Sequence, residues 1–299
     1  MKTKSIILAA IALLFAACSN ESEVSKSEAD KVPVSVHVNE FSISMSEFAG
    51  ARSGTRATDA ADYSDVKAVT LAFYDVDGTE VYKNTQVKTD ASTYTTFGDF
   101  PVDLQIGHYT MVALGYNVGT GDEFTLTSPT EAGYTSERPR EMFCFTDQVT
   151  VTKATPLNLS VTLDHISAML NILSTDGRSA SVTKLRTTFS KGGKTFDPTS
   201  GLALTDAGFT QTNNVNKSVG VAVEINIFPF LFTDEEKMDV TIDALDKDDV
   251  VLFSKLIPNV EFKRGYKTTI KGPIFTPGTS AVGFQLNTDW GEGKTYTFD

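Results

Sequence analysis

The stretch that decides the fold class is VKAVTLAFYDVDGTEVYK, residues 66–83. Its first part, VKAVTLAFY, has the composition of a β-strand. Asp77-Gly78 is a dipeptide that tight hairpin turns favour, and a second strand-like segment follows it. The stretch therefore predicts a β-hairpin.

Nearly everything after residue 33 shows the same pattern of short strands separated by turn residues, and no segment sustains a helical period of apolar residues. The turn signals recur every 8–12 residues or so, roughly the spacing of antiparallel sandwiches. The predicted class is therefore all-β. The clearest further segments are FPVDLQIGHYTMVALGYN (100–117), VTKLRTTFSKGGKTFD (182–197, a hairpin turned at Gly192-Gly193), SVGVAVEINIFPFLF (218–232, a strand stopped by Pro229) and KMDVTIDALDKDDVVLFSKLI (237–257, a hairpin).

One alternating segment, LNLSVTLDHISAMLNILST at residues 157–175, is too long for a single strand of about five or six residues. We interpret it as the crossing from a first sandwich into a second. The chain has 299 residues, which is enough for one large domain or two ordinary ones.

The first residues have the layout of a secretory signal. Two lysines precede the apolar run IILAAIALLFAA (6–17), which is shorter than the roughly 20 residues that a spanning helix needs. The junction LFAAC resembles the lipobox of bacterial lipoproteins, although Phe15 stands where an aliphatic residue is commoner. This resemblance predicts cleavage between Ala17 and Cys18 and lipidation (palmitate) of Cys18. The alternative is an ordinary signal with a chance cysteine. The following SNESE (19–23) resembles the surface-export signal of lipoproteins in Bacteroidetes-type bacteria.

Charge and cysteine content narrow the function classes. The chain has 26 basic and 38 acidic residues and a net charge of −12, which argues against nucleic acid or an acidic membrane surface as a partner. The only cysteine besides Cys18 is Cys144, so a lipidated chain has no intrachain disulfide and depends on its packed core.

No group of residues predicts catalysis, a metal site or a cofactor. His37, His108 and His165 lie in separate strand-like segments without metal-ligand spacing. DVDGTE (75–80) lacks the glutamate of a calcium loop and is better explained as a hairpin turn, and ALDKDDVV (244–251) is explained in the same way. A serine nucleophile elbow is absent, and Trp290 is the only tryptophan that could serve a sugar platform. We expect a protein that is not an enzyme.

The segment PVSVHVNEFSISMSEF (33–48) has one apolar face. Val34, Val36 and Val38 alternate, and Phe41, Ile43 and Met45 continue the pattern after a shift at 39–40. Burying about five such side chains would contribute on the order of 10 kcal/mol. Removing this strand would leave a groove to be refilled.

Directly after it comes FAGARSGTRATDA (48–60), in which small residues surround two arginines and no strand pattern is visible. Such a segment is predicted to be exposed and mobile. A trypsin-like protease specific for arginine could cut between Arg56 and Ala57, or less readily after Arg52. The alternative is a flexible hairpin loop with two solvated arginines.

The C-terminal tail provides a spare strand. After the break at Pro277-Gly278, Val282, Phe284 and Leu286 alternate. The tail could be a strand of its own domain, or it could complete a neighbour's sheet by strand addition, which builds an open filament.

Taken in order, several of these motifs resemble the fimbrillins, the subunits of type V pili in Bacteroidetes-type bacteria, over most of the chain. The motifs are the lipobox ending at Cys18, the strand followed by Arg56, VTLAFYDVDGTEVY, LQIGHYTMVALGYN, HISAMLNIL and FKRGYKTTIKGPIF. The resemblance implies two transthyretin-like (Ig-like Greek-key) antiparallel β-sandwich domains in tandem. It divides the chain into a signal peptide (1–17), a lipidated pro-segment with the removable strand (18–56), two sandwiches (57–160 and 161–280) and a donor strand (281–299).

The resemblance also implies a life cycle: an outer-membrane lipoprotein, cut by an arginine-specific protease and polymerised head to tail by donor-strand exchange into an adhesive fimbrium. Its partners would be other copies or related pilus subunits. The role as stalk, tip or anchor stays open, and the Gly-rich WGEGK (290–294) would interrupt a long donor strand. The alternative function is a surface lipoprotein that binds glycans for an uptake system.

Overall fold

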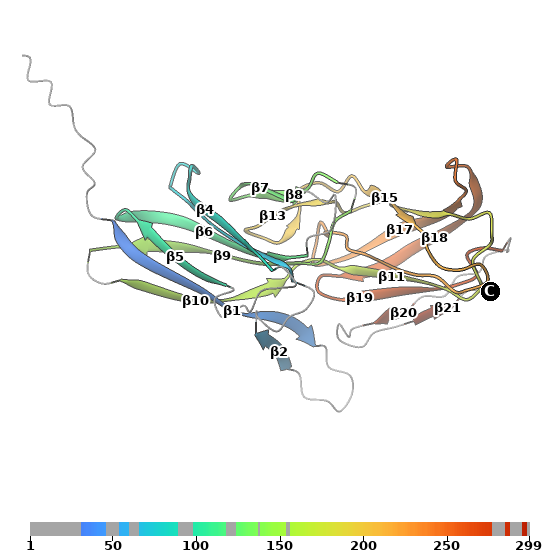
Figure 1. Cartoon of the computed structure of the whole chain (residues 1–299), viewed down its shortest axis with the longest axis horizontal. Coiled ribbons are helices and arrows are strands. Elements are labelled where there is room, and N and C mark those ends of the chain that lie inside the picture. The colour runs from blue at the N-terminus through green and yellow to red at the C-terminus, as the bar shows by residue number, and fades with distance from the viewer. Residues whose placement is uncertain are drawn as a thin grey trace, which may run out of the picture.

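The computed structural model describes residues 31–45, 54–59, 66–88, 98–117, 124–136, 138–153, 156–276, 285–287 and 295–297. These residues form strands, turns and bends, so the predicted all-β class is confirmed. None of the described segments is a helix with the length and apolar character to cross a bilayer. The strands lie along an elongated molecule, with β1 to β10 mostly at one end and β11 to β21 mostly at the other (Figure 1).

The first sheet has eight strands in the order β2-β1-β10-β9-β6-β3-β4, and β5 joins it by pairing with β1. Because β10 and β9 pair only through Asp164–Cys144 and His165–Phe143, this sheet consists of two parts that face each other. The bounds are β1 (Val32–Met45), β2 (Gly54–Asp59), β3 (Ala68–Tyr74), β4 (Glu80–Val87), β5 (Asp99–Leu104), β6 (Gly107–Tyr116), β9 (Met142–Val151) and β10 (Leu157–His165).

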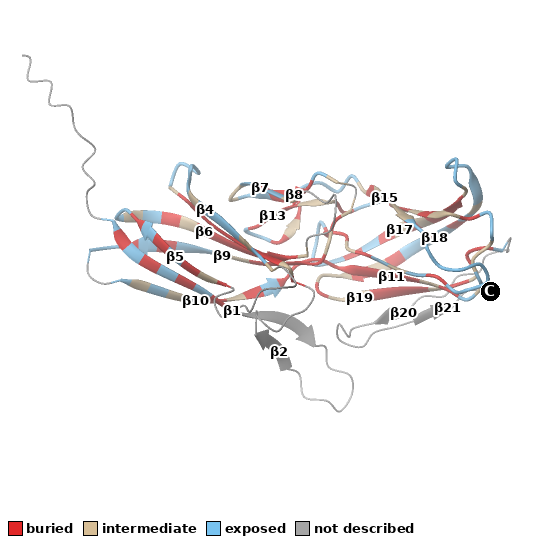
Figure 2. Cartoon of the chain, in the orientation of Figure 1, coloured by how far each residue is buried: buried red, intermediate tan, exposed pale blue. Residues whose placement is uncertain are grey.

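A first hydrophobic core lies between the two parts of this sheet. It takes valines from β1, Phe100 and Leu104 from β5, and Leu163 from β10 on one side, and side chains of β3, β6 and β9 on the other. The buried positions alternate with exposed ones along β1 and β5 (Figure 2). This region is therefore a sandwich closed by β1, β5 and β10.

A second core lies between two further sheets. One has the order β16-β11-β19-β20 with β21 paired to β19, and the other has the order β15-β12-β17-β18. Buried residues of both sheets, such as Leu170 and Ile270 on one and Phe189 and Ile242 on the other, share one cluster. The bounds are β11 (Met169–Ser174), β16 (Glu224–Ile227), β19 (Lys267–Gly272), β20 (Gln285–Asn287), β21 (Thr295–Thr297), β12 (Lys184–Phe189), β15 (Phe209–Asn214), β17 (Glu235–Leu245) and β18 (Val251–Lys263).

A small fourth sheet joins the two ends of the molecule. Its order is β14-β13-β8-β7, from β7 (Phe124–Ser128), β8 (Glu131–Tyr134), β13 (Thr195–Asp197) and β14 (Leu202–Ala203). Phe196 and Phe230 from the later part of the chain pack here with Leu114 and Tyr134 from the earlier part. The junction is therefore a hydrophobic contact that both parts of the chain build.

Several local predictions are confirmed. β3 and β4 form the predicted hairpin, in which Gly78 has φ +76° and the Asp75 carboxylate accepts hydrogen bonds from the backbone N–H groups of Asp77 and Thr79. β17 and β18 form the hairpin predicted for 237–257. The crossing predicted at 157–175 is also present, because β10 belongs to the first sheet and β11 to the second.

Two local predictions are wrong. The segment 182–197 is not a hairpin: β12 pairs with β15 and β17, whereas β13 pairs with β8 and β14 at the junction. The chain crosses between sheets at Gly192-Gly193 because Phe196 is buried in the junction cluster. The segment 48–60, which was predicted to contain no strand, includes one: Gly54–Asp59 forms β2 by pairing with β1.

Candidate functional site

The candidate site is the place of β1 in the first sandwich, which we call the β1 groove. Its walls are β5 and β10. Residues Val34 to Ser42 of β1 pair in parallel with Leu157 to Asp164 of β10, and residues Val32 to His37 pair antiparallel with Leu104 to Asp99 of β5. A register shift between Val38 and Glu40 coincides with the break in alternation seen in the sequence. β1 therefore holds two strands together.

The inward face of β1 is part of the core. Val34, Val36 and Val38 are each 1% exposed and Val32 is 8% exposed. At about 1.5–3 kcal/mol for each fully buried valine, these side chains stabilise the sandwich by an amount on the order of 10 kcal/mol. A chain that lost β1 would expose this apolar surface and the backbone groups of two strand edges.

Contacts from β4 and β5 fix one end of the groove. The Val38 N–H donates to the Gly98 carbonyl at 3.0 Å. The Gln86 side chain of β4 accepts from the Gly98 N–H at 2.8 Å and donates to the Asp99 carbonyl at 2.6 Å. Between β1 and β5, the His37 ring Nδ1 contacts the Asp99 carboxylate. Because Gln86 belongs to another strand, it holds the start of β5 independently of β1.

Gly98 is required where it stands. Its φ is +93°, and a Cβ at this position would lie 2.9 Å from the Val38 carbonyl oxygen and 3.3 Å from the Val38 Cβ. From the sequence, Gly98 can be recognised only as a turn residue. Nothing in the sequence pattern indicates that Gln86 or Asp99 lies beside the β1 groove. These contacts were not predicted because they depend on which strands become neighbours.

The predicted cleavage bond lies in β2. Arg56 is opposite Ile43 and Ala57 is opposite Ser42 in the antiparallel pair, and β2 is the terminal strand of its sheet. The Arg56–Ala57 bond therefore lies in an edge strand that follows β1 in the chain. Ala17 and Cys18 lie outside the described residues.

The donor-strand residues are only partly described. Val282 and Phe284 lie outside the described residues, whereas Leu286 is in β20, opposite Thr268 of β19. β21 pairs with β19 in parallel, further along the same strand. The Asp176 carboxylate accepts from the backbone N–H groups of Ile274 and Phe275, immediately before the tail. The described part of the tail therefore adds to the sheet of its own chain.

The three histidines lie on three different strands, β1, β6 and β10. His108 Nδ1 lies 3.0 Å from Thr150 Oγ1 on the first sheet, while His165 is buried and stacks on Phe143 with 4.5 Å between the ring centroids. Burial lowers the pKa of His165 to about 3, although Glu141 Oε1 lies 3.5 Å from its Nε2 and would favour the proton. Within the ranges that the structure describes, no three His, Cys, Asp or Glu side chains could hold a metal ion together.

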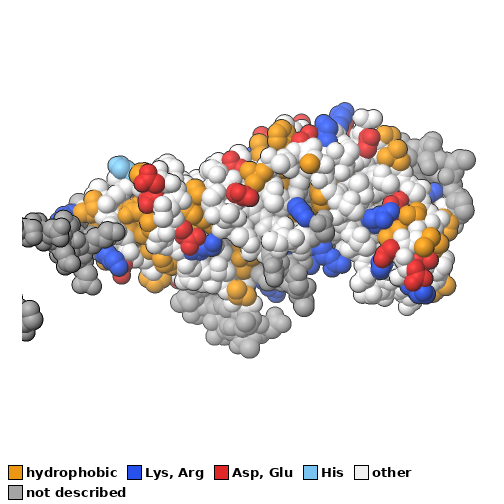
Figure 3. All heavy atoms as spheres, turned by 90° about the horizontal axis from the view of Figure 1, so that it is seen from above, with side chains coloured by type: hydrophobic (Ala, Val, Ile, Leu, Met, Phe, Trp, Pro, Cys, Tyr) orange, Lys and Arg blue, Asp and Glu red, His pale blue; other side chains and the backbone are white. Residues whose placement is uncertain are grey.

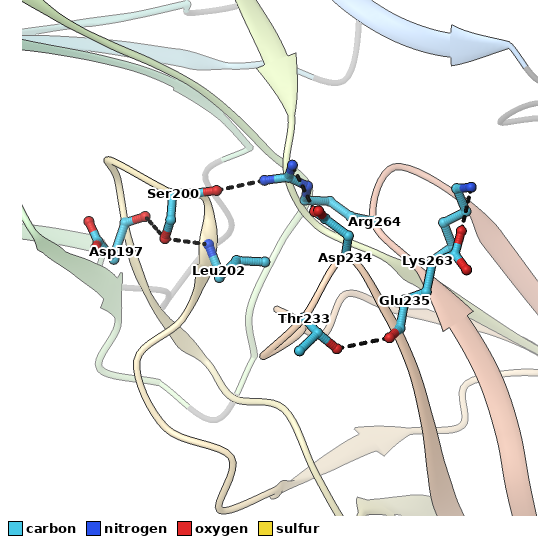
Figure 4. A network of polar contacts seen from close by, with 8 residues as sticks. All are labelled: Asp197, Ser200, Leu202, Thr233, Asp234, Glu235, Lys263 and Arg264. Atoms are coloured by element: carbon cyan, nitrogen blue, oxygen red, sulfur yellow. Dashed lines mark hydrogen bonds and ion pairs between the residues drawn. The ribbon is translucent and has the colours of Figure 1, made fainter.

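A polar cleft of about 650 Å³ lies at the junction, with Cys144 and Ile166 among its lining residues. Figure 4 shows that its charged groups bind one another: Arg264 bridges the Ser200 carbonyl at 2.6 Å and Asp234 at 2.8 Å, and Lys263 bonds Glu235 at 2.6 Å. Burial raises the pKa of the Cys144 thiol to about 12, so it stays protonated at neutral pH. The cleft therefore lies between the two ends of the molecule, and Cys144 is not an activated nucleophile in it.

Charged side chains of both signs are interspersed on the face shown in Figure 3, among apolar and polar patches. This distribution differs from the continuous basic surface that nucleic acid requires.

Solved structures with similar folds come from Bacteroides and related bacteria. A candidate adhesin from Bacteroides ovatus is 11% identical, with 77% of this chain and 84% of that chain covered and a TM-score of 0.50. A candidate polysaccharide-binding protein from Bacteroides thetaiotaomicron is 11% identical, with 86% and 96% covered and a TM-score of 0.50. The fimbrial anchor protein Mfa2 from Porphyromonas gingivalis is 12% identical, with 75% and 82% covered and a TM-score of 0.44.

The first two similarities show that this chain shares its fold with the candidate adhesin and the candidate polysaccharide-binding protein. No curated protein matches the chain in sequence. The profile of a family of unknown function, DUF6562, matches residues 29–297. Because this match spans nearly the whole sequence, including the β1 groove and the tail, the chain belongs to the DUF6562 family.

Proposed function

We propose that the chain is a structural subunit of a cell-surface pilus, assembled by strand exchange into the β1 groove and supporting adhesion. The observation that carries this proposal is the place of β1: a strand near the N-terminus fills the core between β5 and β10, and Arg56 follows it in an edge strand. The fold shared with a candidate adhesin supports the same conclusion.

In this proposal the subunit is exported as a lipoprotein on Cys18 and held at the outer membrane. Its body consists of two transthyretin-like sandwich domains, 57–160 and 161–280. An arginine-specific protease cuts between Arg56 and Ala57, which separates the lipidated strand from the body. A donor strand from another subunit then replaces β1, and the chain's own tail (281–299) is the candidate donor to a neighbour.

Head-to-tail addition of this kind builds a filament, because the groove and the donor strand occupy different ends of the subunit. The exchange replaces one set of buried side chains and backbone pairs by another. The net free energy therefore depends on how well the donor strand fits, and the cut lets the original strand dissociate because it is no longer covalently linked to the body.

The test is limited digestion of the lipid-free chain with a low dose of trypsin. We expect a new N-terminus at Ala57, and oligomers that grow with protein concentration in size-exclusion chromatography. Arg56→Ala should abolish both, while the matched change Arg52→Ala should leave both intact. Cutting at Arg56 without any oligomers, or oligomers from the uncut Arg56→Ala chain, would contradict strand exchange after proteolysis.

Two further variants test the remaining parts. Cys18→Ala should remove incorporation of labelled palmitate in the producing bacterium. Deletion of 281–299 should give a chain that folds but does not polymerise. If the deleted chain unfolds instead, the pairing of β20 and β21 with β19 is needed for the chain's own core.

A further inference from the structure

The β1 groove places strict size limits on any strand that refills it. Val34, Val36 and Val38 are each 1% exposed and share one cluster with side chains of β3, β6, β9, β5 and β10. Protein cores are packed as densely as organic crystals, so the space left by a valine is valine-sized. A longer side chain at these positions displaces core side chains or backbone.

The limit is sharpest at the end of the groove. The Gly98 backbone lies directly against Val38, with the Val38 N–H bonded to the Gly98 carbonyl at 3.0 Å. A Cβ added to Gly98 would already be 3.3 Å from the Val38 Cβ, and Gln86 fixes the Gly98 N–H and the Asp99 carbonyl. This wall cannot move away without breaking the bonds of Gln86.

The tail of this chain does not match these limits. Its alternating residues are Val282, Phe284 and Leu286. Two registers place all of them on inward positions between 32 and 38. In one, Phe284 takes the position of Val36 and Leu286 that of Val38; in the other, Phe284 takes the position of Val34 and Leu286 that of Val36. Either register introduces two side chains larger than valine, including one phenyl ring.

We infer that the β1 groove takes a strand of a different subunit, with valine or another small β-branched residue at successive alternate positions, in preference to the tail of a second copy of this chain, which refills the groove only weakly and at high protein concentration. The inference rests on the proposed function. It narrows the partner from any pilus subunit to one whose donor strand has small β-branched residues at the inward positions. Overpacking at one core position weakens binding by about tenfold or more, so two oversized side chains weaken it by about 100-fold.

The experiment measures peptides competing for the groove. The lipid-free chain is cut after Arg56, unfolded, and refolded with a fluorescein-labelled peptide of residues 31–41, KVPVSVHVNEF. Unlabelled competitors are the same peptide, the tail peptide of residues 280–290, SAVGFQLNTDW, and the tail peptide carrying Phe284→Val and Leu286→Val. Fluorescence anisotropy after refolding gives the concentration of each competitor that displaces half of the label.

We expect the tail peptide to compete about 100-fold less well than the 31–41 peptide, and the two valine substitutions to recover most of that difference. A tail peptide that competes within threefold of the 31–41 peptide overturns the inference, as does a doubly substituted peptide no better than the tail. If the labelled 31–41 peptide itself does not enter the cut chain, the exchangeable groove of the proposed function is wrong, which distinguishes the two failures.

Discussion

Replacing Val36 by alanine tests whether β1 is held by its buried face. Val36 is 1% exposed and lies midway along the part of β1 that pairs with both β5 and β10. Val36→Ala removes two methyl groups from the core, at roughly 0.8 kcal/mol each, and leaves a cavity that adds to the loss. We expect the free energy of unfolding of the intact chain to fall by about 2–3 kcal/mol.

The loss is measured by urea unfolding of the lipid-free chain, followed by circular dichroism. The matched control is Ser35→Ala, since Ser35 is the exposed neighbour on the opposite face of the same strand and its truncation should change stability by less than about 0.5 kcal/mol. In the chain cut after Arg56, the same loss should weaken retention of the severed strand by roughly 30- to 150-fold. A Val36→Ala effect no larger than that of Ser35→Ala would refute the buried-strand reasoning.

Three other changes follow from the packing. Gly98→Ala should destabilise more than Gly78→Ala in urea unfolding, because both glycines have positive φ but only a Cβ at Gly98 meets the chain, at the Val38 carbonyl; equal effects would contradict the close approach. Burial lowers the pKa of His165 to about 3 in the folded chain, so below pH 6.5 the unfolded state binds more protons than the folded state. The free energy of unfolding should therefore drop by about 2 kcal/mol between pH 6.5 and pH 5 and keep falling toward pH 3. His165→Leu should flatten this slope, and an unchanged slope would assign it to other groups. The Cys144 thiol, with its pKa raised to about 12 by burial, should react with a disulfide reagent at pH 8 only after urea unfolding, so rapid reaction in the folded chain would show an open thiol.

The sequence predicts the groove strand itself but not the walls that hold it. The alternation of Val34, Val36 and Val38 needs only local information, because a buried face in a strand always has period two. Whether Asp99 and Gln86 stand beside that strand depends on pairings between distant segments, for which the chain has no local signal. The same reason explains the incorrect hairpin at Gly192-Gly193: a turn that reverses a chain and one that crosses between sheets favour the same residues.

The missed strand β2 shows the opposite limit. Gly54 and Ala57 are residue types that strands disfavour, and the segment has no apolar alternation, so the sequence pattern predicts a loop. Pairing with β1 supplies the strand geometry that the side chains do not. If β1 stabilises β2 in this way, the two strands should separate before a protease can bind at Arg56. Cleavage would then depend on the stability of the β1–β2 pairing around Ile43 and Arg56.

The connectivity of β1 explains why a strand so deeply buried could be exchanged at all. β1 pairs in parallel with β10, and a parallel neighbour is never joined by a short turn. Its other partner in the groove, β5, is connected through the chain to β4 and β6, so neither wall depends on a covalent link to β1. A single cut after Arg56 therefore frees β1 from the chain without interrupting any wall of the groove. What remains to hold it is only the fit of its side chains and its backbone pairs, which a better-fitting strand from another subunit could provide in its place.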